Sequence, residues 1–307
     1  MNKIYDVIII GSGPAGLTAG IYASRAELDT LIIEKNGMSG GQIVNTYEVD
    51  NYPGLSGISG FELATKFREH LDGLGGKFVS GNVSTFELNG DIKKITLDNG
   101  ETYDAKTVII ASGAINRKLN VKGEKELTGM GVSYCATCDG AFFRNKTVAV
   151  VGGGDVAVED AIFLARLCKK VYVIHRRDEF RAAKTLTTKL FSLDNIEVIW
   201  DSKVDEIIGN EVVESIKVSN IKSNENINLE VNGVFIAVGM IPNSQIYEGI
   251  IEMDKNGYLI ANEDCKTNIN GVYAAGDIRT KDLKQIITAA ADGANAITAV
   301  ERYLNEI

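Results

Sequence analysis

Residues 5–16 read YDVIIIGSGPAG, a short apolar and β-branched run that leads directly into a glycine-rich turn. The run predicts a buried strand over residues 5–10, and the stretch after the turn predicts a helix over residues 17–25. A second apolar strand, residues 30–33, ends at Glu34. Strand, G-x-G-x-x-G turn, helix, strand and acid occur here in the order of the dinucleotide-binding fingerprint, so this segment is predicted to bind a dinucleotide.

Each residue of this fingerprint has a physical task. Gly11 permits the tight turn, Gly13 lets a pyrophosphate approach the backbone, and Gly16 lets the helix pack closely on the strand. The start of the helix offers free N–H groups and the positive end of its dipole to the phosphates. Glu34 can accept hydrogen bonds from ribose hydroxyls, and its charge predicts a dinucleotide without a 2′-phosphate.

A second copy of the pattern lies in residues 147–157, which read TVAVVGGGDVA. It predicts a buried strand, a glycine turn and a helix up to about residue 167, followed by a strand over residues 171–174. The predicted fold class is therefore α/β, with two Rossmann-like, three-layer dinucleotide-binding domains, the second inserted into the first.

The two copies differ at the residue that follows their second strand. His175 has the same offset from the first glycine of its turn as Glu34 has in the first copy, and Arg176 and Arg177 follow it. Replacing an acid by cations removes a repulsion and supplies guanidinium groups for a 2′-phosphate, so this site is predicted to bind NADPH. The alternative is a solvated basic turn. The predicted NADPH contacts are Gly152, Gly154, Asp155, Ala157, His175, Arg176, Arg177 and Arg181.

Asp155 directly follows the second glycine turn, where a carboxylate has two opposite consequences. It can repel the pyrophosphate, or it can cap the N-terminus of the helix, a position that favours Asp. The sequence leaves both interpretations open.

The tail of the chain is too short for a third domain of this kind. Residues 271–277 read GVYAAGD, which predicts a strand that runs into a glycine and an acid, and residues 284–304 predict a helix. These elements can complete the first domain and bring Asp277 to its ligand. The predicted first domain is therefore discontinuous, residues 1–116 and 246–307, and residues 117–245 form the second.

Cys135 and Cys138 form a C-x-x-C motif shortly before the second glycine unit, so they belong to the second domain. At a helical turn, backbone N–H groups lower the pKa of one thiol, and the short spacing allows a reversible disulfide. The adjacent Asp139 can transfer protons as a thiolate forms or leaves. We therefore predict Cys135, Cys138 and Asp139 to be catalytic; the alternatives are half of a metal site or an idle pair.

The other cysteines and histidines do not support a metal site. A structural zinc site needs four soft ligands in local clusters, but there is no second C-x-x-C, and His70 and His175 are the only histidines. Cys168 and Cys265 have no partner in sequence, and Cys168 is predicted to be a buried thiol. We predict no bound metal.

Composition excludes several classes of partner. The net charge of the 307 residues is −9, which gives no basic surface for nucleic acid or an anionic membrane. The apolar stretch 7–10 is too short for a signal peptide, and no segment approaches the ~20 apolar residues of a membrane span. We expect a cytoplasmic protein that binds neither nucleic acid nor membrane.

Five runs of residues together resemble one family. They are GSGPAG at 11–16, CATCDG at 135–140, GGGDVA at 152–157, HRRDEFR at 175–181 and AGD at 275–277. Over essentially its whole length the chain resembles the bacterial-type low-molecular-weight thioredoxin reductases. The resemblance implies FAD in the first domain, NADPH in the second, thioredoxin as the protein substrate and a homodimer as the active form.

The resemblance also implies roles for single residues. Cys138 is expected to face the flavin, Cys135 to attack the disulfide of thioredoxin, and Asp139 to act as acid and base. The expected FAD contacts are Gly11, Ser12, Gly13, Pro14, Ala15, Gly16, Glu34, Lys35, Gly40, Gly41, Gln42, Asn51, Gly113, Asp277, Lys284, Gln285 and Ile286. Ser112 departs from the family, which often has threonine there, and we expect little effect from it.

One domain is expected to carry both the nicotinamide site and the dithiol, while the other carries the flavin. Both must therefore reach the same flavin in turn. We expect the domains to rotate between the half-reactions about two connectors, residues 114–123 and 240–245, which become adjacent when the tail folds back.

Other functions stay open. One is a related flavin disulfide reductase that uses another dithiol protein or a ferredoxin donor. A second is a flavin oxidase that uses NADPH and whose cysteines are incidental, and a third is a non-enzymatic FAD-binding module. A glutathione- or lipoamide-type reductase is disfavoured, because residues 35–60 contain no cysteine.

Overall fold

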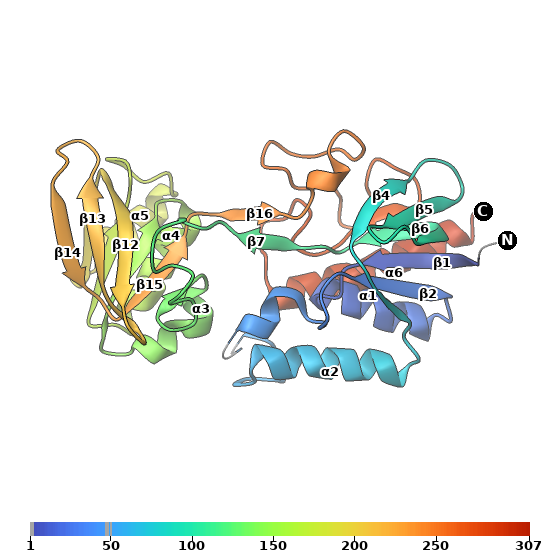
Figure 1. Ribbon diagram of the computed structural model, residues 1–307, viewed down its shortest axis with the longest axis horizontal. Helices are drawn as coiled ribbons and strands as arrows, with labels where there is room; N and C mark the ends of the chain where they lie inside the picture. Colours follow the sequence, from blue (N-terminus) through green and yellow to red (C-terminus); the bar gives the residue numbers. More distant parts are fainter. Residues whose placement is uncertain (1–2, 47–48, 50) are drawn as a thin grey trace. The chain divides into compact units, whose positions relative to one another are not determined.

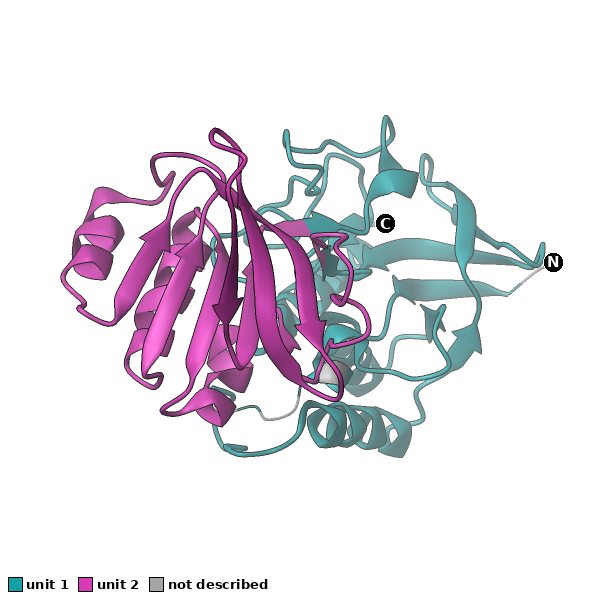
Figure 2. Ribbon diagram, turned by 60° about the vertical axis from the view of Figure 1, so that its left-hand side comes forward, with its two compact units in different colours: residues 1–115, 241–307 teal, residues 116–240 magenta. Residues whose placement is uncertain are grey.

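The chain folds into two compact units, which Figure 2 shows in two colours. Unit 1 comprises residues 1–115 and 241–307, and unit 2 comprises residues 116–240. The computed structural model describes residues 3–46, 49 and 51–307. Unit 2 is continuous in sequence and interrupts unit 1, and its second boundary falls several residues before the position expected from the sequence.

Unit 1 is built around a seven-stranded sheet. The strand order is β3-β2-β1-β6-β5-β4, and β17 also pairs with β6. The strands are β1 (Ile4–Ile10), β2 (Thr30–Glu34), β3 (Phe78–Ser80), β4 (Val83–Glu87), β5 (Lys93–Leu97), β6 (Thr102–Ile110) and β17 (Val272–Ala274). β1, β2, β3, β6 and β17 are parallel, whereas the hairpin β4–β5 adds antiparallel strands to β6. The tail thus completes this sheet through β17, as the sequence predicts.

Both faces of this sheet are covered, as a three-layer fold requires. On one face lie α1 (Pro14–Arg25), α2 (Gly60–Gly73) and α6 (Ile286–Leu304) (Figure 1). α1 and α6 pack so closely that a Cβ on Gly293 would lie 2.3 Å from the carbonyl oxygen of Ala15. On the other face, the buried side chain of Ile8 lies in one core cluster with Tyr247 and Leu259, which belong to the part of unit 1 that follows unit 2.

Unit 2 has a parallel sheet of order β11-β10-β9-β15-β8. Its strands are β8 (Val132–Ser133), β9 (Thr147–Gly152), β10 (Lys170–Ile174), β11 (Ile196–Ile199) and β15 (Gly233–Ala237). One face packs on α3 (Ala136–Asp139), α4 (Asp155–Ala165) and α5 (Lys184–Phe191). The other packs on an antiparallel sheet of β12 (Ser202–Gly209), β13 (Val213–Asn220) and β14 (Asn226–Glu230), which the sequence did not predict. The predicted α/β class with two Rossmann-like folds is confirmed.

The two connectors between the units pair with each other. β7 (Ala114–Asn116) and β16 (Met240–Pro242) form a two-stranded sheet. Beyond its ends, the N–H of Arg117 donates to the carbonyl oxygen of Gly239 at 2.9 Å. The prediction that the connectors become adjacent is confirmed.

Within the described residues, no helix is long and apolar enough to span a membrane. α6, with 19 residues the longest helix of that part, carries Asp292, Glu301 and Arg302.

Candidate functional site

The redox pair lies at the end of β8, where the chain turns into the short helix α3. Cys135 is the residue before the helix, Cys138 lies within it, and the two sulfurs form a disulfide. Both cysteines are partly exposed, and the Thr137 hydroxyl lies 3.4 Å from Sγ of Cys135. The predicted pairing of the C-x-x-C cysteines at a helical turn is therefore confirmed.

Asp139 ends α3 and is half-buried beside this disulfide. Its Oδ2 accepts a hydrogen bond from the Ser133 hydroxyl at 2.6 Å. Burial raises the pKa of the Asp139 carboxyl above its ordinary value, and the Ser133 hydrogen bond opposes that shift. A carboxyl with a raised pKa exchanges protons closer to neutral pH, which suits an acid/base group.

The expected FAD contacts lie beyond the carboxyl ends of the parallel strands of unit 1, where ligands of such sheets bind. The turn 11–16 follows β1. Glu34 is the last residue of β2, and Lys35 follows it. Gly113 comes after β6, and Asp277 comes after β17. Gly40 precedes, and Gly41 and Gln42 begin, a short 3-10 helix, η1 (Gly41–Asn45). Lys284, Gln285 and Ile286 lie at the start of α6.

The first glycine turn is tightly packed on one side and open on the other. A Cβ on Gly16 would lie 1.9 Å from the carbonyl oxygen of Gly11, so only glycine fits there. A Cβ on Gly13 would meet no atom nearer than 4.0 Å. The N–H of Gly40 donates to the carbonyl oxygen of Ser12 at 2.7 Å, which brings the expected 40–42 contacts to the turn.

The Glu34 carboxylate accepts four hydrogen bonds from the protein. Oε2 accepts from the N–H and hydroxyl of Ser12 at 2.8 and 2.7 Å. Oε1 accepts from the N–H and side-chain amide of Asn36 at 2.8 and 3.0 Å. Glu34 therefore fastens the glycine turn to the end of β2, and a ribose hydroxyl has to share its oxygens with these donors.

Two hydrogen bonds join expected FAD contacts that are far apart in sequence. The side-chain amide of Asn51 donates to Oε1 of Gln285 at 2.9 Å. The side-chain amide of Gln42 donates to the carbonyl oxygen of Ala114, the neighbour of Gly113. The first bond links the loop after η1 to the start of α6, and the second links η1 itself to the residue that begins the connector strand at Ala114.

Asp277 has a buried oxygen, Oδ1, with no hydrogen-bond partner among the described residues. Burial raises the pKa of its carboxyl, while Lys281 and Lys284 act in the opposite direction. A buried oxygen of this kind is costly unless a donor reaches it. The preceding Gly276 approaches the glycine turn, since a Cβ there would lie 2.9 Å from the Cβ of Ala15. A dinucleotide with ribityl or ribose hydroxyls, such as FAD, fits these residues.

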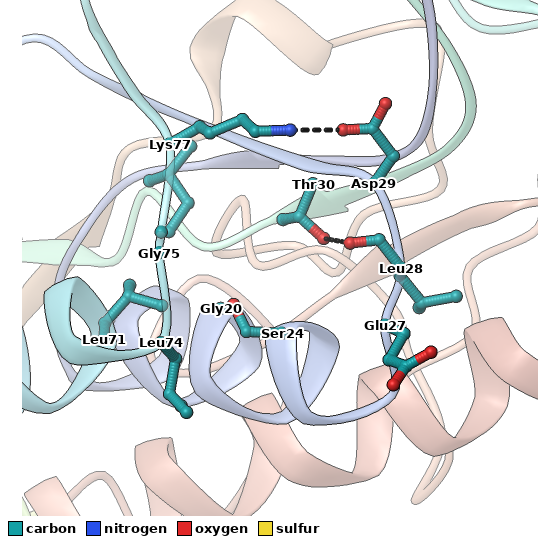
Figure 3. Close-up of a pocket in the computed structure, with 12 residues that line it drawn as sticks. Gly20, Ser24, Glu27, Leu28, Asp29, Thr30, Leu71, Leu74, Gly75 and Lys77 are labelled. Atoms are coloured by element: carbon teal, nitrogen blue, oxygen red, sulfur yellow. Dashed lines mark hydrogen bonds and ion pairs between the residues drawn. The ribbon is translucent and has the colours of Figure 1, made fainter.

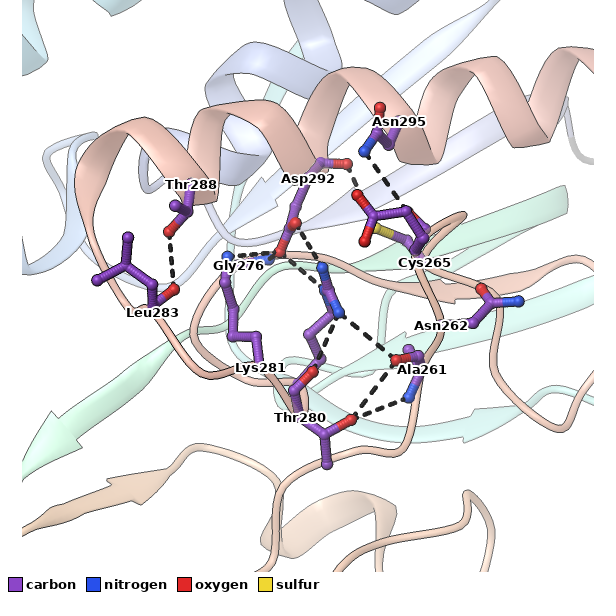
Figure 4. A network of polar contacts seen from close by, with 12 residues as sticks. Ala261, Asn262, Cys265, Gly276, Thr280, Lys281, Leu283, Thr288, Asp292 and Asn295 are labelled. Atoms are coloured by element: carbon purple, nitrogen blue, oxygen red, sulfur yellow. Dashed lines mark hydrogen bonds and ion pairs between the residues drawn. The ribbon is translucent and has the colours of Figure 1, made fainter. Parts of the chain in front are cut away.

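A buried ion cluster supports the Asp277 loop (Figure 4). Asp292 of α6 accepts Arg279 Nη2 at 2.7 Å, Arg279 Nε at 2.9 Å, Lys281 Nζ at 2.9 Å and the Gly276 N–H at 2.8 Å. The side chains of Arg279, Lys281 and Asp292 are 8%, 8% and 5% exposed. Sequence reasoning missed this cluster. The sequence signal for it is an Asp within an apolar helix. This Asp predicts a buried ion pair only once α6 is known to pack on the Asp277 loop.

Lys284 serves the same loop. Its ammonium donates to the carbonyl oxygens of Arg279 and Lys281 at 3.3 and 3.2 Å and lies 4.2 Å from the centre of the Tyr258 ring. Burial lowers the pKa of its amino group. Its expected contact with FAD stays a prediction.

In unit 2, His175 lies beneath the second glycine turn. Its side chain is only 4% exposed, and a Cβ on Gly153 would lie 2.1 Å from the imidazole ring. Nε2 lies 3.1 Å from the carbonyl oxygen of Glu179, and burial lowers the pKa of the ring. His175 thus supports the turn and the loop that follows it. Its predicted contact with NADPH stays a prediction.

Arg176, Arg177 and Arg181 are exposed, and no ion pair involves any of them in the described part of the chain. Asp155 is the first residue of α4 and directly follows the N-cap residue Gly154, so it does not stand at the N-cap position. Its Oδ1 instead accepts the N–H of Ala183 at 2.8 Å. The carboxylate therefore holds the end of the loop that carries the arginines.

A cavity of about 370 Å³ lies elsewhere in unit 1, between α1, α2 and the start of β2 (Figure 3). Asp29 at its edge is paired with Lys77 at 2.8 Å and with Lys3 at 2.8 Å. The cavity is at the amino end of β2, opposite the glycine turn. It therefore does not belong to the nucleotide site.

The family model of pyridine nucleotide-disulphide oxidoreductases matches residues 5–293. The thioredoxin reductase of Listeria innocua is 46% identical over 308 residues, which cover 100% of this chain and 96% of the relative. That of Bacillus subtilis is 44% identical over 307 residues, with 100% and 96% covered. The chain belongs to the thioredoxin reductases of this family.

Solved structures of thioredoxin reductases agree with this. The Streptococcus pyogenes thioredoxin reductase is 47% identical, covers 100% of both chains and has a TM-score of 0.90. The Lactococcus lactis thioredoxin reductase, described in its FR conformation, is 44% identical with 99% and 100% covered and a TM-score of 0.73. The predicted resemblance, fold class and enzyme class, a disulfide oxidoreductase of the flavoprotein type, are confirmed.

Proposed function

We propose that the chain is an NADPH-dependent, FAD-containing reductase of the disulfide of oxidised thioredoxin. The observation that carries the proposal is the Cys135–Cys138 disulfide beside Asp139, on the unit that also contains the second glycine turn. Thioredoxin is the substrate named for relatives that are 44–46% identical over the full chain.

Unit 1 holds FAD in this proposal. The open side of the turn at Gly13 receives the pyrophosphate, Glu34 receives ribose hydroxyls, and Asp277 Oδ1 gains a donor. When bound, FAD supplies the two-electron carrier between the nicotinamide of NADPH and the disulfide.

Unit 2 holds NADPH. The turn at Gly152 and Gly154 and the first N–H groups of α4 receive the pyrophosphate. Arg176, Arg177 and Arg181 are exposed in one loop and supply the charge for a 2′-phosphate.

The reduced pair then transfers its two electrons by thiol–disulfide exchange. The Cys135 thiolate attacks one sulfur of the thioredoxin disulfide, which forms a mixed disulfide and releases one thioredoxin thiolate. The Cys138 thiolate attacks Cys135 Sγ, restores the intramolecular disulfide and releases the second thiolate. Asp139 accepts a proton from an attacking thiol and returns it to a leaving thiolate, so that two protons end on thioredoxin.

Unit 2 rotates about the paired connectors β7 and β16 between the half-reactions. Two observations support this: the NADPH residues and the disulfide are on one unit, and the L. lactis relative is named in one particular conformation. A cross-link that fixes the two units in one orientation is expected to stop multiple turnover with thioredoxin. Undiminished turnover of the cross-linked enzyme contradicts the rotation.

The decisive experiment is an anaerobic titration of the yellow holoenzyme with NADPH, followed by oxidised thioredoxin. We expect bleaching of the flavin by NADPH and its recovery on addition of thioredoxin. Bleaching without recovery by any thioredoxin tested refutes the substrate and leaves the flavin chemistry intact.

Variants Cys135→Ser and Cys138→Ser separate the reductase from an oxidase. Both are expected to lose thioredoxin-dependent disulfide reduction. An oxidase keeps its oxygen-dependent NADPH consumption in both variants at the wild-type rate.

The active form in this proposal is a cytoplasmic homodimer, which rests on the family resemblance. Sedimentation of the holoenzyme is expected to give twice the chain mass of 33.1 kDa. A single species of chain mass contradicts the dimer.

A further inference from the structure

Ser133 is the last residue of β8, and its buried hydroxyl connects the disulfide turn to Asp139. The residue is 5% exposed. Its Oγ lies 2.6 Å from Asp139 Oδ2 and accepts the N–H of Cys135 at 3.1 Å. One small side chain thus touches both the backbone of the redox pair and the carboxyl beside it.

The direction of these hydrogen bonds follows from the atoms. Asp139, when ionised, is acceptor-only, so the single proton of the hydroxyl goes to the carboxylate. The alternative acceptor, the carbonyl oxygen of Cys135, lies farther away at 3.3 Å. A bond of 2.6 Å from a hydroxyl to a carboxylate has the length of a charge-assisted hydrogen bond.

We infer that Ser133 is a positioning residue for proton transfer: its hydroxyl fixes the Asp139 carboxyl against the turn of the redox pair and stabilises the ionised form. The inference rests on the proposed function, in which Asp139 exchanges protons with the thiols. It assigns to Ser133 a role that the C-x-x-C motif does not imply.

Among the groups around Asp139, the Ser133 hydroxyl is the one that opposes the effect of burial on the pKa of its carboxyl. β8 and its neighbour β15 carry no charged side chain. α4, which packs against α3, carries the carboxyls Asp155, Glu159 and Asp160, and Arg144 follows the 3-10 helix η2 (Gly140–Phe143). Among the described residues, burial and Ser133 alone shift the pKa of Asp139. Reduction of the disulfide adds two titratable groups next to Asp139, the thiols of Cys135 and Cys138.

Removal of the hydroxyl has a defined consequence. Burial then acts unopposed, so the pKa of Asp139 rises further. The carboxylate that accepts a thiol proton is then present only at higher pH. The acid limb of the exchange rate moves upward by about one pH unit, which is about a tenfold loss of rate at a fixed pH on that limb.

The test is a single-turnover experiment with NADPH-reduced holoenzyme and oxidised thioredoxin between acid and mildly alkaline pH. Ser133→Ala is expected to shift the acid limb upward, and Ser133→Thr, which keeps a hydroxyl, is expected to restore it. Reduction of the flavin by NADPH, followed separately, is expected to be unchanged. Ser202→Ala is the matched control, because Ser202 is also a buried serine of unit 2 and its hydroxyl donates one hydrogen bond, to the carbonyl oxygen of Trp200 at 2.7 Å.

Asp139→Asn distinguishes failure of the inference from failure of the function. If Asp139→Asn abolishes the acid limb and Ser133→Ala leaves it at the wild-type pH, the inference is overturned and the proposed function stands. If Asp139→Asn also leaves the limb unchanged, the acid/base role of Asp139 fails and the inference fails with it. Should Ser133→Ala not yield folded holoenzyme, the nearly isosteric pair Ser133→Thr and Ser133→Val makes the same comparison.

Discussion

The carboxylate of Asp155 accepts a hydrogen bond from the backbone N–H of Ala183 across 2.8 Å. The bond ties the first turn of α4 to the end of the arginine loop. A second bond, from the N–H of Arg181 to the carbonyl oxygen of Gly153 at 2.8 Å, ties the same loop to the glycine turn. The loop expected to bind the 2′-phosphate is thus held by the second glycine turn and by the first residue of α4.

Asp155→Ala removes the acceptor and is expected to raise the KM for NADPH about threefold to tenfold, the value of one hydrogen bond, with little change in kcat. Asp155→Asn keeps an acceptor and removes the charge, so its KM is expected to equal or fall below that of the wild type. Glu211→Gln, at an exposed carboxyl of the same unit, controls for net charge. A wild-type KM in Asp155→Ala shows that the loop does not depend on this bond.

Arg177→Ala is expected to raise the KM for NADPH by about tenfold or more, because it removes a charge-assisted contact to the 2′-phosphate. NADH lacks that phosphate and serves as the internal control, and its KM is expected to stay the same. Lys189→Ala removes an exposed charge of α5 and controls for the overall potential. Equal losses with both coenzymes contradict a 2′-phosphate site.

Asp292→Asn is expected to lower the free energy of unfolding by about 3–5 kcal/mol, since it leaves Arg279 and Lys281 buried without their anion. Loss of FAD is expected to accompany it, because the Asp277 loop is anchored by the same carboxylate. Urea unfolding of the holoenzyme measures the first effect and gel filtration the second. Glu301→Gln, at an exposed carboxyl of α6, is expected to change neither.

The pH dependence of this stability has a definite sign. Burial raises the pKa of Asp292, but the hydrogen bonds from Arg279 and Lys281 outweigh it and leave the pKa below the ordinary 3.8. A lowered carboxyl pKa gives stability that is fully present above 3.8 and is lost as the pH falls through the folded value. Wild type and Asp292→Asn are therefore expected to differ at neutral pH and to converge in strong acid; a constant difference down to strong acid contradicts the pairing.

Cys168 and Cys265 are expected to resist alkylation in the folded enzyme. Burial raises the pKa of their thiols to about 11 and about 12, so neither forms the reactive thiolate near neutral pH. After reduction by NADPH, peptide mass spectrometry is expected to find iodoacetamide on Cys135 and Cys138 alone, and on all four cysteines after unfolding. Rapid native labelling of Cys265 contradicts its burial.

The sequence predicted the parts of the fold that repeat a local pattern. Local sequence was enough to predict both glycine turns, their flanking strands and the disulfide turn, because each depends on residues close in sequence. The β12–β14 sheet was missed, because it packs on the parallel sheet through contacts between residues that are far apart in sequence.

The same limit applies to the site. Cys135, Cys138 and Asp139 stand in one motif, so their proximity was predictable. The ties from Asp155 to Ala183 and from Asp292 to Arg279 join residues on different elements. His175 was predicted to contact NADPH from its register, but its burial beneath Gly153 became evident only from the packing of the turn.

The return of the tail to unit 1 also bears on how the chain is made. Unit 2, residues 116–240, is complete as soon as it leaves the ribosome. The sheet of unit 1 lacks β17, and α1 lacks its partner α6, until the residues that follow unit 2 have been synthesised. The part of unit 1 that precedes unit 2 therefore keeps the apolar surfaces that later contact β17 and α6 exposed while unit 2 folds. Loss of α6 therefore removes the packing partner of α1, a helix that is translated before unit 2.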